Sequence, residues 1–173
     1  MQWPNPPQMA IDQSKKYQAT IKTDLGDIIV QLFPEDAPLA VNNFVFLSGQ
    51  GFYDGVKFHR IVEGFVIQSG DPTGTGSGGP GYRFADEQVS RDYITGTVAM
   101  ANAGPDTNGS QFFITLSDLS GKLPKNYTIF GLVTSGFDVV EKIGDMQVTQ
   151  SPGGERSMPV TNVNINSVII ETE

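Results

Sequence analysis

The sequence contains no cysteine and only one histidine, His59. Without cysteine there is no disulfide, no thiol catalysis and no cysteine-ligated zinc or iron–sulfur site. With a single histidine, a histidine-rich metal site is excluded, and any Ser-His-Asp triad would have to use His59. Apart from a triad through His59, the chemistry of this protein must therefore come from other kinds of side chain.

Positive charge and long apolar runs are scarce as well. Lysine and arginine number 11 against 19 acidic residues, for a net charge of −8, whereas nucleic-acid binding needs clustered cations. No apolar run approaches the ~20 residues of a membrane span, and residues 1–14 lack the basic start and apolar core of a signal peptide. We therefore expect no nucleic-acid partner and no membrane span. We expect a cytoplasmic location, with an exported or periplasmic domain as the alternative.

Turn-forming residues are abundant, with 20 glycines and 11 prolines among 173 residues. This composition favours short strands joined by turns over a helical bundle, and the length suits one domain. The prolines and polar residues of residues 1–16 indicate an extended N-terminal tail, so the domain is expected at residues 17–173. Trp3, the only tryptophan, leaves open whether this tail docks on the domain or stays loose.

Alternating apolar and polar residues predict about eight short strands. They are expected at residues 17–23, 27–33, 56–62, 65–69, 97–101, 111–115, 129–133 and 163–171. A first helix should be capped by Asp36 and end at Gly49, and a second should cover residues 137–143. Short antiparallel strands with no edge to spare favour a mainly β fold: a closed eight-stranded antiparallel barrel capped by two helices.

A glycine-rich segment matches the dinucleotide-binding pattern at Gly74, Gly76 and Gly79. That pattern requires a helix directly after it, so that backbone N–H groups can bind the phosphates. Pro80 and Gly81 follow here instead, which prevents such a helix. We therefore interpret the segment as a surface loop.

The motif FHRI, residues 58–61, places an arginine among apolar residues on a predicted strand. Strand alternation would put Phe58 and Arg60 on one face and His59 and Ile61 on the other. An arginine between aromatic and aliphatic neighbours is costly to bury without a purpose or a partner. A functional role is one interpretation, and a structural salt bridge at the rim of the barrel is the other.

Further motifs follow in a specific order: GFVIQSGDP at residues 64–72, MANAGPDTNGSQFFI at residues 100–114, and FGLV at residues 130–133. Together with FHRI, this series resembles the cyclophilin-type peptidyl-prolyl cis-trans isomerases from about Tyr17 to Glu171. The resemblance implies an eight-stranded barrel with two helices, in agreement with the strand count. It also implies an enzyme that accelerates rotation of X–Pro bonds and assists protein folding. The alternative is a non-catalytic proline-peptide binding module or chaperone on the same fold.

The resemblance also implies the site residues. Arg60 matches the catalytic arginine of the family, with Gln68 and Phe65 beside it in the catalytic set. The substrate-binding set implied is Val66, Ala101, Asn102, Gln111, Phe113, Leu123 and Tyr127. Val66 stands where many members carry Met, and Lys122 stands where many carry Trp. Because that Trp is missing, we expect cyclosporin binding to be weak.

Rotation about an amide bond breaks no covalent bond, so the implied reaction requires no nucleophile, metal or cofactor. The expected partners are proline-containing peptides and unfolded or flexible protein clients. We expect the protein to act as a monomer.

Overall fold

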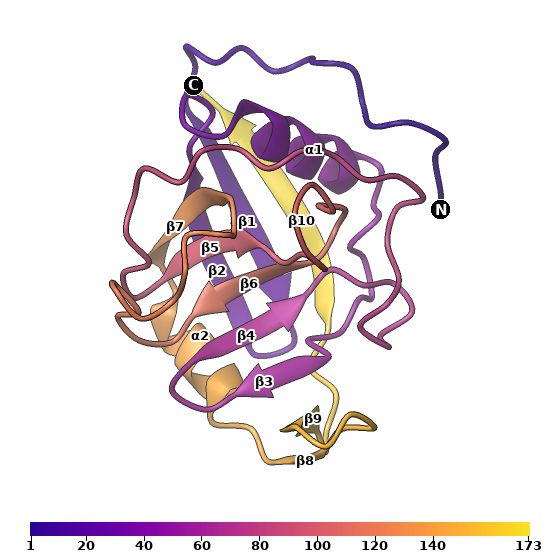
Figure 1. Cartoon of the computed structure of the whole chain (residues 1–173), viewed down its shortest axis with the longest axis vertical. Coiled ribbons are helices and arrows are strands. Elements are labelled where there is room, and N and C mark those ends of the chain that lie inside the picture. The colour runs from indigo at the N-terminus through magenta and orange to yellow at the C-terminus, as the bar shows by residue number, and fades with distance from the viewer.

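The computed structural model describes all residues from 1 to 173 and contains ten strands and two helices. Eight strands form one antiparallel sheet in the order β10-β1-β2-β7-β5-β6-β4-β3 (Figure 1). The bounds of these strands are β1 Tyr17–Thr23, β2 Gly26–Leu32, β3 Arg60–Val62, β4 Val66–Ser69, β5 Thr97–Met100, β6 Phe112–Thr115, β7 Ile129–Ser135 and β10 Ile165–Thr172. The predicted mainly β architecture is confirmed.

The predicted eight-stranded antiparallel sheet is present, but the word closed slightly overstates how far it curls. The sheet curls through about 201°, and β3 and β10 remain its two edges. Residues 55–58 bridge the gap without forming a strand: the Phe58 N–H donates to the Val163 carbonyl at 2.9 Å, and the Ile165 N–H donates to the Val56 carbonyl at 2.8 Å. The predicted strand at residues 56–62 therefore divides its pairing between β10 and β4, and only residues 60–62 join the sheet.

This division also corrects the predicted facing of the FHRI motif. Phe58 and Ile61 are both about 1% exposed and both belong to the core, whereas the Arg60 side chain is 31% exposed. Simple alternation fails because the chain is not a continuous strand before Arg60. Arg60 nevertheless lies on the outer face of the sheet, where its side chain is accessible.

A hairpin that the sequence analysis missed lies between the second helix and β10. It consists of β8 Val148–Gln150 and β9 Arg156–Pro159, which pair only with each other. The hairpin lies at the bottom of Figure 1 beside β3, and β3 and β9 are in contact. Its strands are short and mostly exposed, so no hydrophobic alternation marked them in the sequence.

Two helices cover opposite ends of the curled sheet, as predicted: α1 Pro38–Gly49 and α2 Phe137–Gly144 (Figure 1). Phe44 of α1 packs against Phe112 and Phe130, with ring centroids 5.6 and 5.3 Å apart. These rings belong to a large core of buried side chains inside the curled sheet. Neither helix is long and apolar enough to cross a membrane.

Asp36, predicted to cap α1, does not do so. The N-cap residue is Ala37 and makes no side-chain cap hydrogen bond. Instead the Glu87 carboxylate accepts hydrogen bonds from the N–H groups of Leu39 at 3.0 Å and Ala40 at 2.8 Å. A carboxylate at this end also suits the helix dipole. Asp36 pairs with Arg91 instead, and no local pattern could reveal a cap supplied from 47 residues away.

Alternation on β4, β5 and β6 separates the core from a second cluster on the outer face of the sheet. Ile67, Val98 and Ile114 point into the core, whereas Val66, Ala99 and Phe113 belong to the outer cluster. Successive residues of a strand point to opposite faces, so strands that are buried on both sides supply both groups. The outer cluster is the floor on which the candidate site is built.

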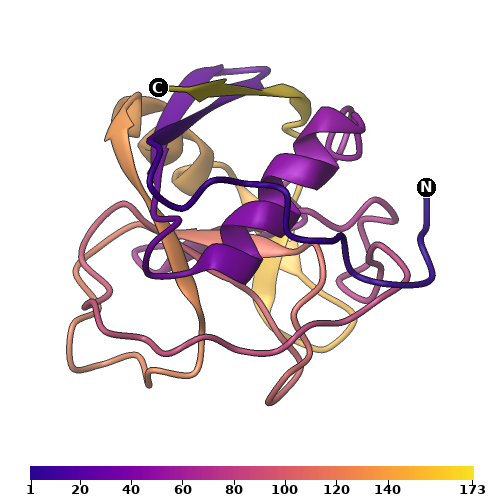
Figure 2. The same ribbon diagram turned by 90° about the horizontal axis from the view of Figure 1, so that it is seen from above.

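The N-terminal residues 1–16 contain no helix or strand, but they lie along α1 (Figure 2). The Trp3 ring packs against Phe46 of α1 with a centroid distance of 5.1 Å. The buried Asn42 side chain accepts a hydrogen bond from the Ala10 N–H at 2.9 Å and donates one to the Gln8 carbonyl at 3.0 Å. Of the two possibilities for this tail, the structure has the docked one.

Candidate active site

The register of the sheet places four residues, one from each of β3, β4, β6 and β5, side by side in a row across the strands. Arg60 of β3 pairs with Gln68 of β4, Gln68 pairs with Phe113 of β6, and Phe113 pairs with Ala99 of β5. Cross-strand partners lie on the same face of a sheet. A shift of one residue in any of these pairings would move a member of the row to the other face.

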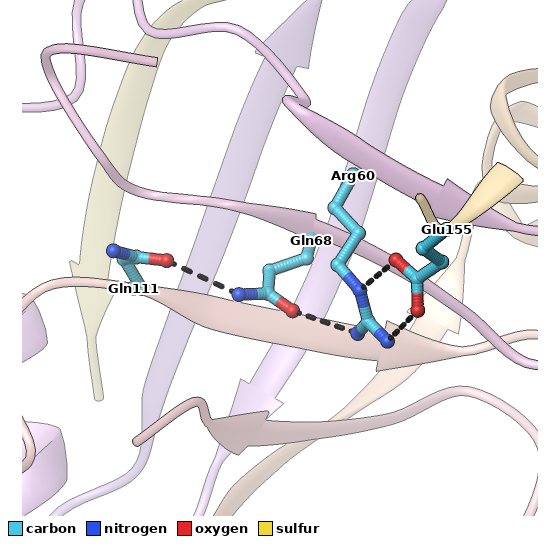
Figure 3. Close-up of polar contacts among 4 residues, drawn as sticks. All are labelled: Arg60, Gln68, Gln111 and Glu155. Atoms are coloured by element: carbon cyan, nitrogen blue, oxygen red, sulfur yellow. Dashed lines mark hydrogen bonds and ion pairs between the residues drawn. The ribbon is translucent and has the colours of Figure 1, made fainter. Parts of the chain in front are cut away.

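The Arg60 guanidinium is held by a line of hydrogen bonds (Figure 3). Its Nη1 donates to Gln68 Oε1 at 3.1 Å, and Gln68 Nε2 donates to Gln111 Oε1 at 3.1 Å. Gln111 Nε2 in turn donates to the carbonyls of Gly76 and Gly78, both at 3.0 Å. Since an amide donates only through nitrogen, this line fixes the orientation of both glutamine side chains.

The other side of the guanidinium is bound by Glu155 (Figure 3). Arg60 Nε donates to Glu155 Oε1 and Nη2 donates to Oε2, both at 2.9 Å. The hydrogen bond from Arg60, together with one from Ser157, lowers the pKa of Glu155 to about 2. The carboxylate is therefore ionised at neutral pH, and the pair is a bidentate ion pair.

The glycine-rich loop anchors the far end of this line. It folds around the fully buried Asp71, which accepts hydrogen bonds from the N–H groups of Thr73, Gly76 and Gly78. Burial alone would raise the pKa of Asp71, but these hydrogen bonds and one from the Thr73 hydroxyl bring it down to about 2. The loop thus serves as a rigid support for Gln111, and no helix follows it.

A pocket of about 270 Å³, lined mostly by apolar residues, opens beside Arg60. Its walls are Arg60, Phe65, Val66, Gln68, Ala101, Asn102, Phe113, Leu123 and Tyr127. The volume lies just below the ~300–1,000 Å³ of pockets for drug-sized ligands. A pocket of this size suits one compact apolar group.

Buried contacts behind the pocket hold its far wall in place. Phe113 and Tyr127 meet edge to face with centroids 5.5 Å apart. The buried Tyr93 hydroxyl donates to the Tyr127 carbonyl at 2.7 Å and accepts from the Tyr127 N–H at 3.1 Å. The Asn102 side chain donates to the Asn126 carbonyl at 2.9 Å and so ties the two flanking loops together.

Nine of the ten site residues predicted from the sequence line this pocket. The tenth, Gln111, lies in an adjoining polar hollow of about 840 Å³ that shares Gln68, Ala101 and Asn102 with the pocket. Lys122 is exposed and does not line the pocket, whereas its neighbour Leu123 does. The structure thus brings the whole predicted set together around one groove.

Glu155 and Asp71 are the functional-site residues that the sequence analysis missed. Glu155 is 95 positions from Arg60 in the sequence. The glycines before Glu155 predict a tight turn, but nothing in them indicates what the turn faces. Asp71 could have been suspected, because an aspartate that precedes a glycine-rich loop is well placed to accept backbone hydrogen bonds.

His59 stands next to Arg60 but takes no part in the line of hydrogen bonds. Neither of its ring nitrogens has a hydrogen-bond partner. Burial lowers the pKa of His59, and the nearby Asp71 only partly offsets this effect. The ring is therefore uncharged at neutral pH.

Sequence comparisons identify the family to which the chain is similar. The model of the family described as cyclophilin type peptidyl-prolyl cis-trans isomerase/CLD matches residues 18–170. A peptidyl-prolyl cis-trans isomerase of Helicobacter pylori is 46% identical over 142 residues, which cover 80% of this chain and 86% of the relative. A probable peptidyl-prolyl cis-trans isomerase A of Mycobacterium leprae is 45% identical over 173 residues, covering 88% and 91%.

Solved structures show the same fold. A cyclophilin-type peptidyl-prolyl cis-trans isomerase of Cryptosporidium parvum, crystallised in the presence of the dipeptide Ala-Pro, has a TM-score of 0.81 and 37% identity. The match covers 90% of this chain and 99% of that one. Fold, groove and relatives together show that this chain belongs to the cyclophilin-type family and is a peptidyl-prolyl cis-trans isomerase.

Proposed function

We propose that the protein isomerises exposed X–Pro bonds in flexible or unfolded segments of client proteins, and that Arg60 supplies the catalysis. The observation that carries this proposal is the placement of the Arg60 guanidinium, which is fixed by Gln68 and lies at the rim of an apolar pocket. The proposal goes beyond the family assignment because it gives each groove residue a role.

The barrier to be lowered is the ~18–20 kcal/mol of amide resonance, which makes uncatalysed isomerisation take tens to hundreds of seconds. During rotation the proline nitrogen becomes pyramidal and its lone pair becomes free to accept a hydrogen bond. The guanidinium can donate to this nitrogen or hold the rotating carbonyl oxygen. These interactions strengthen as the bond twists, so they lower the barrier and not merely the energy of the bound peptide.

Arg60 has N–H groups to spare for this task. A guanidinium carries five N–H bonds, and three of them go to Gln68 and Glu155. Two remain, one on Nη1 and one on Nη2. Because the guanidinium stays protonated at any working pH, its donors are always available.

The pocket is suited to the proline ring. Phe65, Val66, Phe113 and Leu123 would enclose it on their apolar surfaces, and Asn102 would hold the peptide main chain through its backbone groups, as a strand edge does. Only the ring needs to be buried, and the flanking chain can leave through the open groove. All of these groups come from one chain, which supports the proposal that a monomer is sufficient.

Replacing Arg60 with alanine should remove most of the turnover and leave the fold intact. Arg60 supplies the donors for the twisted amide, and its side chain is partly exposed, so its loss should perturb the core little. The measurement is kcat/KM for cis-to-trans conversion of a short proline peptide, with circular dichroism as the control for folding. Near wild-type turnover in a folded Arg60→Ala protein would contradict the proposed roles of the groove residues. If the variant still bound the peptide but no longer turned it over, binding and catalysis would be separated.

The isomerisation rate should be nearly flat from about pH 6 to 8. The proposed step transfers no proton, so no titrating group acts in it. Burial lowers the pKa of His59 and so favours the neutral ring, which takes no part in the proposed step. A steep bell-shaped profile of kcat/KM, measured in buffers of constant ionic strength, would instead assign a role to His59 or to a carboxylate.

Cyclosporin should inhibit this protein weakly, because the exposed Lys122 replaces the Trp that many family members carry. Losing one such aromatic anchor typically costs ~2 kcal/mol or more, about thirtyfold in affinity. Lys122→Trp should recover part of the affinity, and turnover should change little because Lys122 does not line the proline pocket. Inhibition titrations of the two proteins test this. Tight inhibition of the unmodified protein would mean that the loop provides an equivalent contact.

A further inference from the structure

The most informative feature beyond the groove is the carboxylate of Glu155. It is the only acidic group paired with Arg60, and it comes from the β8–β9 hairpin and not from any strand of the main sheet. None of the motifs that carry the family resemblance includes it. Its position raises the question of what an anion does beside the guanidinium that is proposed to act on the substrate.

The turn that carries Glu155 has a defined geometry. The Ser151 N–H donates to the Glu155 carbonyl at 2.7 Å, and the Gly154 N–H donates to the Ser151 carbonyl at 2.9 Å. Gly154 has φ +90°, a conformation that other residues rarely adopt. The hairpin also lies against β3, the strand that begins with Arg60. A short hydrogen-bonded turn between β8 and β9 thus places the Glu155 carboxylate beside Arg60.

The contact engages one particular edge of the guanidinium. Glu155 binds the edge formed by Nε and Nη2, whereas Gln68 binds Nη1 (Figure 3). Two partners at different positions define the plane of the group as well as its place. A single bond to Gln68 would leave the long arginine side chain free to rotate about that bond. With both bonds made, the free N–H of Nη1 and that of Nη2 have fixed directions.

The negative charge of Glu155 has an opposing effect, because it reduces the positive potential that the twisted amide would experience. Solvent weakens this effect, since the Glu155 side chain is 45% exposed and that of Arg60 is 31% exposed. The directional effect acts through the two hydrogen bonds of the ion pair, so it lasts only while that pair stays formed. Small errors in the placement of a catalytic group are costly. Orientation is therefore expected to outweigh the loss of potential.

We propose that Glu155 is a positioning residue for the isomerisation, and that the β8–β9 turn fixes the plane of the Arg60 guanidinium through it. This inference rests on the proposed catalytic role of Arg60. Glu155 itself does not touch the substrate, and its effect reaches the reaction only through Arg60.

The test compares kcat and KM of Glu155→Ala and Glu155→Gln with those of the wild type on an uncharged proline tetrapeptide. Glu155→Ala should lower kcat about tenfold and change KM by less than about twofold, because the pocket remains intact. Glu155→Gln keeps an oxygen that can accept one of the two hydrogen bonds, so it should lower kcat only about threefold. Glu141→Ala, which removes an exposed carboxylate from α2, is the matched charge control and should behave as the wild type.

Ionic strength gives a readout that a purely structural role would not change. Salt screens exposed ion pairs, so raising sodium chloride from about 0.05 to 1 M should lower the wild-type kcat toward that of Glu155→Ala. The kcat of Glu155→Ala should not respond to salt. If Glu155→Ala proves poorly folded, the isosteric Glu155→Gln replaces it, both in the comparison of kcat with the wild type and in the measurement of the salt response. Unchanged or higher kcat in folded Glu155 variants would overturn the inference, and so would a wild-type kcat that is insensitive to salt.

Arg60→Ala and the double variant Arg60→Ala/Glu155→Ala separate this inference from the proposal on which it rests. If Arg60→Ala is inactive and Glu155→Ala equals the wild type, the positioning role of Glu155 is wrong while that of Arg60 stands. If Arg60→Ala is fully active, the catalytic role proposed for Arg60 is wrong, and the positioning role of Glu155 that rests on it is wrong as well. The inference requires the double variant to be no slower than Arg60→Ala alone, because Glu155 acts only through Arg60.

Discussion

The site depends on holding one guanidinium in place at the edge of an apolar pocket. Arginine has a long side chain with many rotamers, and on an exposed strand it would sample several directions. Here the Arg60 guanidinium is bound by Gln68 on one side and by Glu155 on the other. The line continues through Gln111 to a loop organised by the buried Asp71. Each part of this line comes from a different segment of the chain, so the fold as a whole is required to assemble it.

The curled sheet makes this assembly possible because its strands β4, β5 and β6 are buried on both faces. One face fills the core, and the other carries the floor of the pocket. Rigid β structure on both sides of Arg60 keeps the donors and the apolar walls in register. A reaction that breaks no covalent bond needs little more than this. It needs an apolar surface that binds the proline ring and a fixed hydrogen-bond donor for the twisting amide.

Much of the fold and most of the pocket could be predicted from the sequence, because they are local or carried by long motifs. Alternation located the strands, and the motif order identified the groove residues. What could not be predicted depends on contacts between distant segments. Glu87 caps α1, the segment before Arg60 divides its pairing between two edges, and Glu155 reaches Arg60 from a hairpin with almost no apolar pattern. These contacts are fixed by how the chain packs, and a single sequence carries no local signal for them.

We propose that the directed donors of Arg60, and not its positive charge alone, accelerate the rotation. The most direct test is kcat/KM of Arg60→Lys, which keeps a charge near the pocket but loses the planar group with its fixed donors. We expect the activity of Arg60→Lys to be at least about tenfold below that of the wild type and close to that of Arg60→Ala. Activity near that of the wild type in Arg60→Lys would show that a positive charge alone is enough and that the directed donors are not required.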